Sequence, residues 1–197
     1  MISSSVRLFT LMLVILSQTA VLGGCAAAVG AGAAAGAAAF YDRRTTGTLI
    51  DDELIEFRSI NALRQNSELW DQSHINVTSF NNIVLLTGET PDESLRQRAA
   101  EAVGGLEKVR KVHNEIVVAA PSSMISRSSD TWITGKVKTL LLNARKLDAA
   151  RVKVVTENGI VYLMGLVTRF EADAATDVIR QVRGVQRVVK VFEYIDS

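Results

Sequence analysis

The chain has 197 residues and one cysteine, Cys25, whose position indicates lipid attachment. It follows an N-terminal segment, residues 1–24, with a basic side chain at Arg7 and an apolar run from Leu8 to Leu16. This is the pattern of a secretory signal peptide, and it is too short to span a bilayer on its own. The residues Leu22-Gly23-Gly24 directly before the cysteine are typical of a bacterial lipobox, in which the thiol is acylated with fatty acids such as palmitate. The alternative interpretation is a buried or incidental cysteine.

The residue after the cysteine indicates which membrane holds the anchor. It is Ala26 and not Asp, and by the lipoprotein sorting pattern this predicts the outer membrane. Each buried methylene of an acyl chain contributes about 0.8 kcal/mol, so several chains on one residue give a permanent anchor. We therefore expect a lipid-anchored protein of the outer membrane that faces the periplasm.

Residues that could carry catalysis or bind a metal are few. His74 and His113 are the only histidines, and neither stands in a His-Glu-x-x-His or comparable spacing, so we expect edge or surface residues and no metal. The chain contains neither a Gly-x-Ser-x-Gly motif nor a phosphate-binding Gly-x-x-x-x-Gly-Lys-Ser/Thr motif. Its net charge of +1 argues against general nucleic-acid binding. The sequence thus predicts a protein that is not an enzyme, binds no nucleic acid and uses no cofactor.

A tryptophan and basic residues on one predicted helix are the best candidates for a binding site. At about 100° per residue, one face of this helix is apolar and is expected to be core: Ile133, Val137, Leu140 and Ala144, bordered by Leu141. A separate stripe, about 120° away, consists of Trp132, Lys136, Thr139 and Asn143, with Lys138 further round. A tryptophan ring one turn from a lysine suits the headgroup boundary of a membrane. The alternative places the ring in an interdomain groove or at the edge of the core.

The charges of the chain are divided unequally between its two halves. Residues 51–119 include 7 basic and 12 acidic residues, a net charge of −5, whereas residues 121–197 include 12 basic and 8 acidic residues, a net charge of +4. Near an anionic surface each exposed Lys or Arg contributes about 1 kcal/mol, and salt weakens this attraction. The second half is therefore the one suited to an anionic phospholipid membrane, although an ordinary solvated face would carry the same charges.

The elements that must position these residues occur twice in the chain. Residues 75–88 are similar to residues 152–165, and each copy consists of two apolar, β-rich runs joined by a short turn. The turns are Asn81-Asn82 and Asn158-Gly159, which are strong hairpin signals. Each copy therefore begins its sheet with a β-hairpin.

A helix is predicted before and after each hairpin. Asp52 and Asp130 stand where a helix N-cap is expected, and residues 92–103 and 170–182 are rich in Ala and charge at helical spacing. Because a helical crossover delivers the last strand parallel to the second one, each unit should form a small three-stranded mixed sheet with two helices on one face. The predicted fold class is therefore α+β, with two tandem αββαβ domains.

The composition sets the predicted domain boundaries. They are a signal peptide (1–24), the lipidated cysteine with an Ala/Gly-rich tether (25–48), a first domain (49–119), a linker (120–128) and a second domain (129–197). The alternative to a tether is a membrane-inserting helix over Ala26–Ala39, but these fourteen residues are too few to cross about 30 Å of hydrocarbon.

The order and spacing of these features resemble those of the BON-domain family, in the form of dual-BON outer-membrane lipoproteins. The resemblance extends over residues 50–196 and includes Gly88 and Gly165 in the hairpins and the stretch Asp-Thr-Trp-Ile-Thr at 130–134. It implies a non-enzymatic protein that binds anionic phospholipids through its second BON domain, gathers at the cell-division site and supports outer-membrane integrity. It also implies that the first helix of the second domain is the lipid-binding element.

An adaptor for outer-membrane or division-site envelope proteins is the alternative function. On the first helix of the first domain, Phe57 and Ile60 lie off the face that Ile55, Ala62 and Leu63 form. Two apolar groups off this face suggest a second buried contact, either between the domains or with a protein partner. Imperfect packing in a small domain gives the same pattern. For the oligomeric state, a monomer is the favoured expectation.

Replacement of Cys25 by Ser tests the predicted anchor. We expect the Cys25→Ser protein to be lost from outer-membrane fractions, because it has no acyl chains to bury. Cell fractionation, with mass spectrometry for fatty acids on the wild-type protein, measures this. Equal membrane retention of the variant, with no fatty acid on the wild type, would contradict the prediction.

Overall fold

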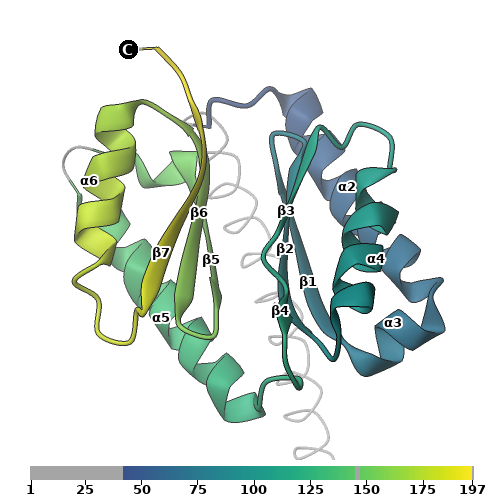
Figure 1. Ribbon diagram of the computed structural model, residues 1–197. Coiled ribbons are helices and arrows are strands. Elements are labelled where there is room, and N and C mark those ends of the chain that lie inside the picture. Colours follow the sequence, from purple (N-terminus) through teal and green to yellow (C-terminus); the bar gives the residue numbers. More distant parts are fainter. Residues whose placement is uncertain (1–41, 145–146, 197) are drawn as a thin grey trace, which may run out of the picture. The chain divides into compact units, whose positions relative to one another are not determined.

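The computed structural model describes residues 42–144 and 147–196, and within them one arrangement of strands and helices occurs twice (Figure 1). In each copy helices cover one face of a mixed β-sheet, which confirms the predicted α+β class with two αββαβ units. The predicted signal peptide, Cys25 and the segment from Ala26 to Phe40 lie outside the described residues.

The first copy is built around a central strand, β2. Its elements in chain order are α2 (Thr46–Arg64), α3 (Ser67–Gln72), β1 (His74–Phe80), β2 (Ile83–Thr90), α4 (Glu93–Gly104), β3 (Lys111–Asn114) and β4 (Val117–Val118). β1 pairs with β2 antiparallel, whereas β3 and β4 both pair with β2 in parallel. β3 and β4 keep a single register, so they act as one strand with a short interruption. The short helix α3 had no sequence-based prediction.

The second copy repeats this order around β6. Its elements are α5 (Met124–Leu142), a 3-10 turn η1 (Ala149–Arg151), β5 (Val152–Glu157), β6 (Ile160–Val167), α6 (Arg169–Ile179) and β7 (Arg187–Tyr194). β5 pairs with β6 antiparallel and β7 pairs with β6 in parallel. The predicted hairpins, crossover helices and parallel last strands are therefore confirmed in both copies.

Both first helices begin earlier than the sequence predicted. Their N-caps are Thr45 and Ser123, whose hydroxyl oxygens accept hydrogen bonds from the helix backbone, and not Asp52 and Asp130. Short polar side chains of all these types cap helices well, so the sequence offered two competing caps for each helix. As a result α2 begins inside the predicted tether and α5 begins inside the predicted linker.

Asp130 and Asp52 are buried within their helices and hold the hairpin turns instead. The Asp130 carboxylate accepts hydrogen bonds from the backbone N–H groups of Asn158 and Gly159, both at 2.8 Å. Asp52 makes the same pair of bonds, also at 2.8 Å, with the turn of the first hairpin. Charge-assisted hydrogen bonds of this kind are stronger than neutral ones. Each first helix is thereby fixed to the tip of its own hairpin.

The turns themselves adopt the backbone conformation that their residue types favour. All four turn residues have positive φ angles, from 49° to 73°: Asn81, Asn82, Asn158 and Gly159. Positive φ at both central positions is the type I′ geometry, whose twist matches the twist of paired strands. Asn and Gly adopt positive φ angles at little cost, because the Asn side chain can hydrogen-bond to nearby backbone and Gly has no Cβ.

Each sheet is buried on both of its faces. The helix-covered faces form separate cores, one in each copy. The opposite faces pack against each other through a shared apolar cluster of Phe80, Ile83, Leu85, Tyr162, Met164 and Val191. In Figure 1 the two sheets accordingly lie between the two helix layers, and β2 is buried along its entire length.

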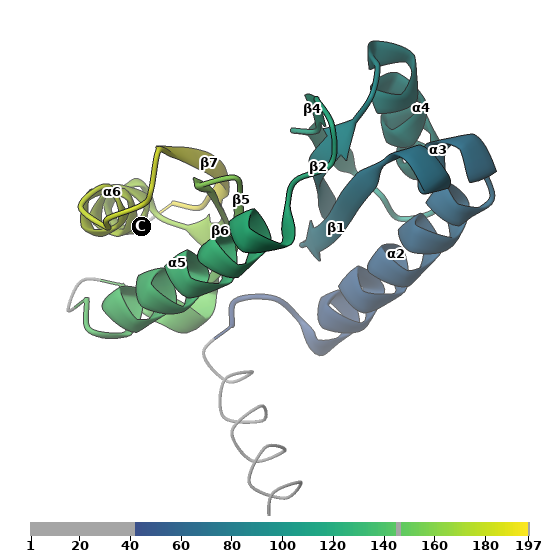
Figure 2. The ribbon, with the colours of Figure 1, turned by 90° about the horizontal axis from the view of Figure 1, so that it is seen from below.

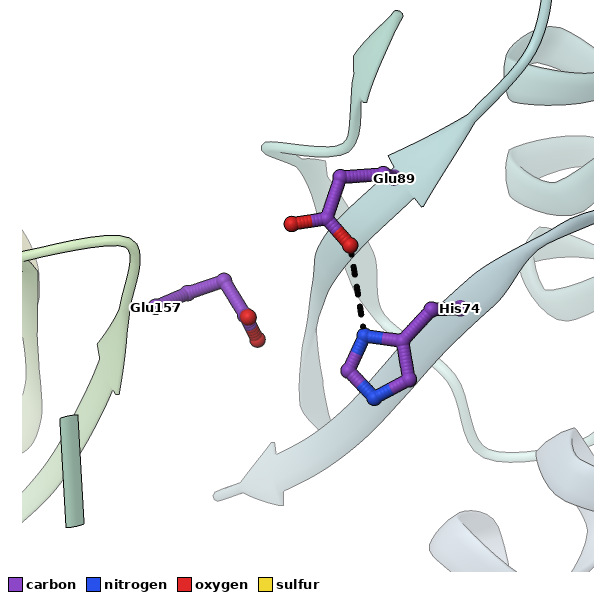
Figure 3. A group of neighbouring side chains, drawn as sticks. All are labelled: His74, Glu89 and Glu157. Carbon is purple, nitrogen blue, oxygen red and sulfur yellow. Dashed lines mark hydrogen bonds and ion pairs between the residues drawn. The ribbon is translucent and has the colours of Figure 1, made fainter. Parts of the chain in front are cut away.

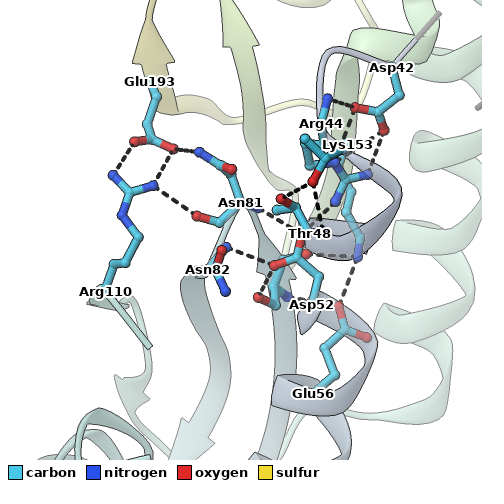
Figure 4. Close-up of polar contacts among 12 residues, drawn as sticks. Asp42, Arg44, Thr48, Asp52, Glu56, Asn81, Asn82, Arg110, Lys153 and Glu193 are labelled. Carbon is cyan, nitrogen blue, oxygen red and sulfur yellow. Dashed lines mark hydrogen bonds and ion pairs between the residues drawn. The ribbon is translucent and has the colours of Figure 1, made fainter. Parts of the chain in front are cut away.

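Polar contacts reinforce the junction of the two sheets near the first hairpin turn (Figure 4). The Lys153 ammonium lies 2.8 Å from the Glu56 carboxylate. The Asn81 amide donates to the Glu193 carboxylate at 2.6 Å, and Arg110 pairs with the same carboxylate at 2.7 Å. Partners from both copies therefore surround the apolar contact with ion pairs and hydrogen bonds.

Removal of the buried Asp130 carboxylate should destabilise the fold. Asp130→Ala leaves a part-buried and a buried backbone N–H group without acceptors, so we expect a loss of about 2–4 kcal/mol in the free energy of unfolding. Urea denaturation measures this loss. The exposed Asp177→Ala variant on α6 is the matched control and should change stability by less than about 0.5 kcal/mol. Equal stabilities of the two variants would contradict the assigned role.

The carboxylate of Glu171 ties the start of the described chain to the second copy. Arg43 and Arg151 each approach it to 2.7 Å, and it accepts a hydrogen bond from the Thr168 N–H in the capping box of α6. Burial alone would raise its pKa, but the hydrogen bonds from Arg43, Thr168 and Arg151 outweigh burial and lower the pKa of Glu171 to about 2. The charged form is therefore favoured in the folded state.

This lowered pKa predicts a pH-dependent contribution to stability. A carboxylate with a depressed folded-state pKa stabilises the protein above its ordinary pKa, and this contribution is lost as the pH falls toward about 2. We expect Glu171→Gln to cost about 2–3 kcal/mol at pH 7, with the difference from wild type shrinking between about pH 5 and pH 2. Denaturation curves at several pH values measure it. Glu93→Gln, in the first turn of α4, should show no comparable trend because Glu93 is exposed.

Candidate functional site

The outer face of α5 carries the residues that the sequence singled out for membrane binding. Trp132 is 56% exposed, and Lys136, Thr139 and Asn143 are exposed on the same side of the helix. The Lys136 ammonium lies 4.9 Å from the centroid of the Trp132 ring, a cation–π distance. The ring is thus presented to solvent and not packed into an interdomain groove.

Additional apolar side chains extend this face toward both ends of α5. Ile125, two turns before Trp132, is 83% exposed, and Leu142, near the end of the helix, is 75% exposed. Met124 is also exposed. Sequence reasoning missed the first two positions of the helix because they fell in the predicted linker. We call Met124, Ile125, Trp132, Lys136 and Leu142, with the polar residues between them, the α5 outer face.

The polar side chains of the α5 outer face bond to their own helix. Thr139 donates to the carbonyl oxygen of Gly135 at 2.9 Å, and Asn143 donates to that of Thr139 at 2.9 Å. Near the start of the helix, Ser128 donates to the carbonyl oxygen of Met124 at 3.0 Å. Because these donors are satisfied internally, moving them out of water costs less than moving free hydroxyl and amide groups.

Lys138 lies apart from this face. It lines an open cavity of about 560 Å³ beside the start of α2, together with Ile50, Glu53 and Lys153 among other residues. Figure 2 shows how α5 lies along its sheet. The structure therefore places four of the five predicted lipid-contact residues on one surface and the fifth on a neighbouring side of α5.

The predicted core face of α5 is present, but its most buried line is rotated slightly about the helix axis. Ile133, Val137 and Leu141 are its fully buried residues, whereas Leu140 and Ala144 pack at its margin. Leu141 was expected at the border and is central. The reason is that the helix packs on β5 and on α6, so its most buried line lies between these two elements.

Phe57 does not form the suggested contact between the domains within the described chain. Phe57 is exposed and forms an apolar line on α2 with Ile50 and Leu54, which are also exposed, while Ile60 is half-buried. The contact between the copies is made by the sheets and not by these residues. Helical periodicity could not predict this contact, because strands and not helices make it.

A second group of polar residues meets where β1, β2 and β5 come together (Figure 3). His74, Glu89 and Glu157 each present a ligand atom, and these three atoms lie within 4.8 Å of one another. The His74 Nδ1 atom is 3.3 Å from Glu89 Oε2. His74 opens the edge strand β1, in line with the expected edge position, and its ring is half-buried beside these carboxylates. Sequence spacing gave no sign of the group, since one of its members belongs to the other repeat.

The environment of Glu157 shifts the pKa of its carboxyl group. Burial raises its pKa above the ordinary value, the hydrogen bond from Asn76 opposes this rise, and the neighbouring Glu89 carboxylate adds to it. Each carboxylate accepts a hydrogen bond from a side-chain amide of the other copy: Asn76 donates to Glu157 at 2.8 Å, and Asn158 donates to Glu89. The carboxylates are therefore held in place by donors from the opposite sheet.

Among the helices of the described ranges, none is both long enough and apolar enough to cross a bilayer.

Comparison with known proteins gives consistent matches. The BON domain family matches residues 51–120 and 129–196. The outer membrane lipoprotein DolP of Haemophilus influenzae is 39% identical over 183 residues, which cover 93% of this chain and 95% of that protein. The 21 kDa hemolysin of Actinobacillus pleuropneumoniae is 40% identical over 154 residues, covering 78% of this chain and 79% of that one. Osmotically-inducible protein Y of Escherichia coli K12 is 28% identical over 145 residues, 72% of each chain.

Proposed function

Because the chain belongs to the BON-domain family and is a DolP-like lipoprotein of the outer membrane, we propose that it binds anionic phospholipids through the α5 outer face. In this proposal it acts at the periplasmic side of the outer membrane without enzymatic activity. It supports the integrity of that membrane, with the division site as the place of action.

The observation that carries the proposal is the exposed apolar line on α5. Trp132, Ile125 and Leu142 are all more than half exposed although burial of such side chains is favourable. A helix that lies in the interface of a bilayer presents such residues to the acyl boundary, and tryptophan prefers the headgroup level. The internally bonded hydroxyl and amide groups of the same face lower the cost of leaving water.

Electrostatics supports an anionic surface as the target. The half of the chain that contains α5 has a net charge of +4, and Lys136 stands beside the Trp132 ring. Each basic residue near anionic lipid contributes about 1 kcal/mol, which gives only weak binding by itself. An acylated Cys25 would raise the local concentration at the membrane, so weak intrinsic affinity is sufficient.

Vesicle binding by the Trp132→Glu variant tests the proposal. We expect at least a tenfold loss of affinity for phosphatidylglycerol-containing vesicles, because the variant removes the inserted ring and adds a negative charge. Lys136→Glu combined with Lys138→Glu should have a similar effect. In wild-type protein, spectral shifts on adding anionic micelles should map to residues 130–143 and fade in high salt.

The other tryptophan of the described chain supplies a matched control. Trp70 on α3 is partly exposed and has the Arg64 guanidinium 4.8 Å from its ring, so it repeats the aromatic–cation pair in the first domain. Trp70→Glu should leave vesicle binding unchanged. Equal losses for Trp70→Glu and Trp132→Glu, or micelle shifts confined to the first domain, would assign the lipid site elsewhere.

A second candidate function rests on the exposed line of α2. Ile50, Leu54 and Phe57 follow one another at helical spacing in the acidic first domain, which suits an envelope protein better than an anionic lipid. In this alternative the first domain is an adaptor, and Phe57→Glu would abolish partner capture while vesicle binding stays normal.

A further inference from the structure

We propose that His74, Glu89 and Glu157 form a binding site for a divalent transition-metal ion of the zinc class that links the two sheets. His74 and Glu89 belong to β1 and β2 of the first domain, whereas Glu157 ends β5 of the second. A bound ion would therefore be shared between the domains. This inference is independent of the proposed lipid binding.

The first argument is the charge balance of the group. Glu89 is 2% exposed and Glu157 is 6% exposed, and buried carboxylates are normally paired with a cation or a metal. Asp130 adds negative potential at Glu157. Arg127 lines the same cavity, yet among the described residues no ion pair within 4.0 Å joins it to either glutamate. His74 is the one basic side chain in direct contact with the pair in that part of the chain.

The second argument is the convergence of the three ligand groups. Asn76 and Thr87 both donate hydrogen bonds to the Oε2 atom of Glu157. The carboxylate points toward His74 and Glu89 in Figure 3. Three ligand atoms that lie within 4.8 Å of one another are close enough to approach one ion.

The ligand types and their spacing suit zinc. Imidazole nitrogen and carboxylate oxygen are both zinc ligands, and a site with three protein ligands leaves a fourth position for water. Zinc bonds of about 2.1 Å in a tetrahedron place ligand atoms roughly 3.4 Å apart. His74 Nδ1 and Glu89 Oε2 already lie 3.3 Å apart, so only a small movement of the Glu157 side chain completes the set.

The surroundings provide orientation and access. The amides of Asn76 and Asn158 hold the two carboxylates from opposite sheets, as outer hydrogen-bond partners do around metal ligands. An open cavity of about 310 Å³, lined in part by His74 and Glu157, connects the group with solvent. An ion can therefore enter without unfolding the junction of the sheets.

Titration with zinc chloride tests the site. We would use the full chain in detergent, with Cys25→Ser as the background so that no free thiol competes, after treatment with a chelator. Calorimetry should show one saturable site with a dissociation constant in the micromolar range or below. At a hundredfold excess of zinc over this constant, the unfolding temperature should rise by about 5–10 °C.

Two near-isosteric variants and one matched variant decide the outcome. Glu157→Gln and His74→Gln should each weaken zinc binding at least tenfold and abolish the rise in unfolding temperature. His113→Gln replaces the other histidine, which lies on β3 outside the group, and should bind zinc like the background protein. Circular dichroism checks that each variant is folded. Absence of saturable binding below about 1 mM zinc, or equal weakening by His113→Gln, would overturn the proposal.

Discussion

The packing of the two sheets against each other is the contact on which the remaining features depend. Each sheet presents one apolar face to its own helices and the other to the neighbouring sheet. A three-stranded sheet with one bare apolar face would expose Leu85, Tyr162 and Met164 to water, at a cost of about 1.5–3 kcal/mol for each large side chain. The face-to-face contact removes this cost for both copies at once. It also explains why β2 is buried along its whole length.

This contact determines what each helix can do. Because the sheets occupy each other's free faces, the helices lie on the outside, and their sides away from the sheets meet solvent. The α5 outer face is available to a membrane for this reason. The same contact brings Glu157 of one repeat to His74 and Glu89 of the other, at a position where the apolar cluster gives way to polar groups.

The two repeats share one structural feature and differ in the surface around it. In both, a buried aspartate on the first helix holds the hairpin turn, so Asp52 and Asp130 are equivalent positions. Two residues further on, Leu54 of the first domain corresponds to Trp132 of the second. A common scaffold therefore presents an aliphatic line in an acidic domain and a tryptophan with a lysine in a basic one. This difference in surface chemistry, and not in fold, separates their proposed roles.

The sequence by itself determined the repeat, the hairpins, the crossover helices and the outward position of Trp132, because turn chemistry and helical periodicity are local properties. It did not determine where α2 and α5 begin, since Thr45 and Asp52 are both good caps and only contact with the hairpin turn decides between them. Nor did it reveal the meeting of His74 with Glu157. Those side chains belong to different repeats, and local sequence patterns do not predict how the two sheets pack against each other. The tertiary structure decided these features, because burial of the second sheet faces selects one pairing of distant residues.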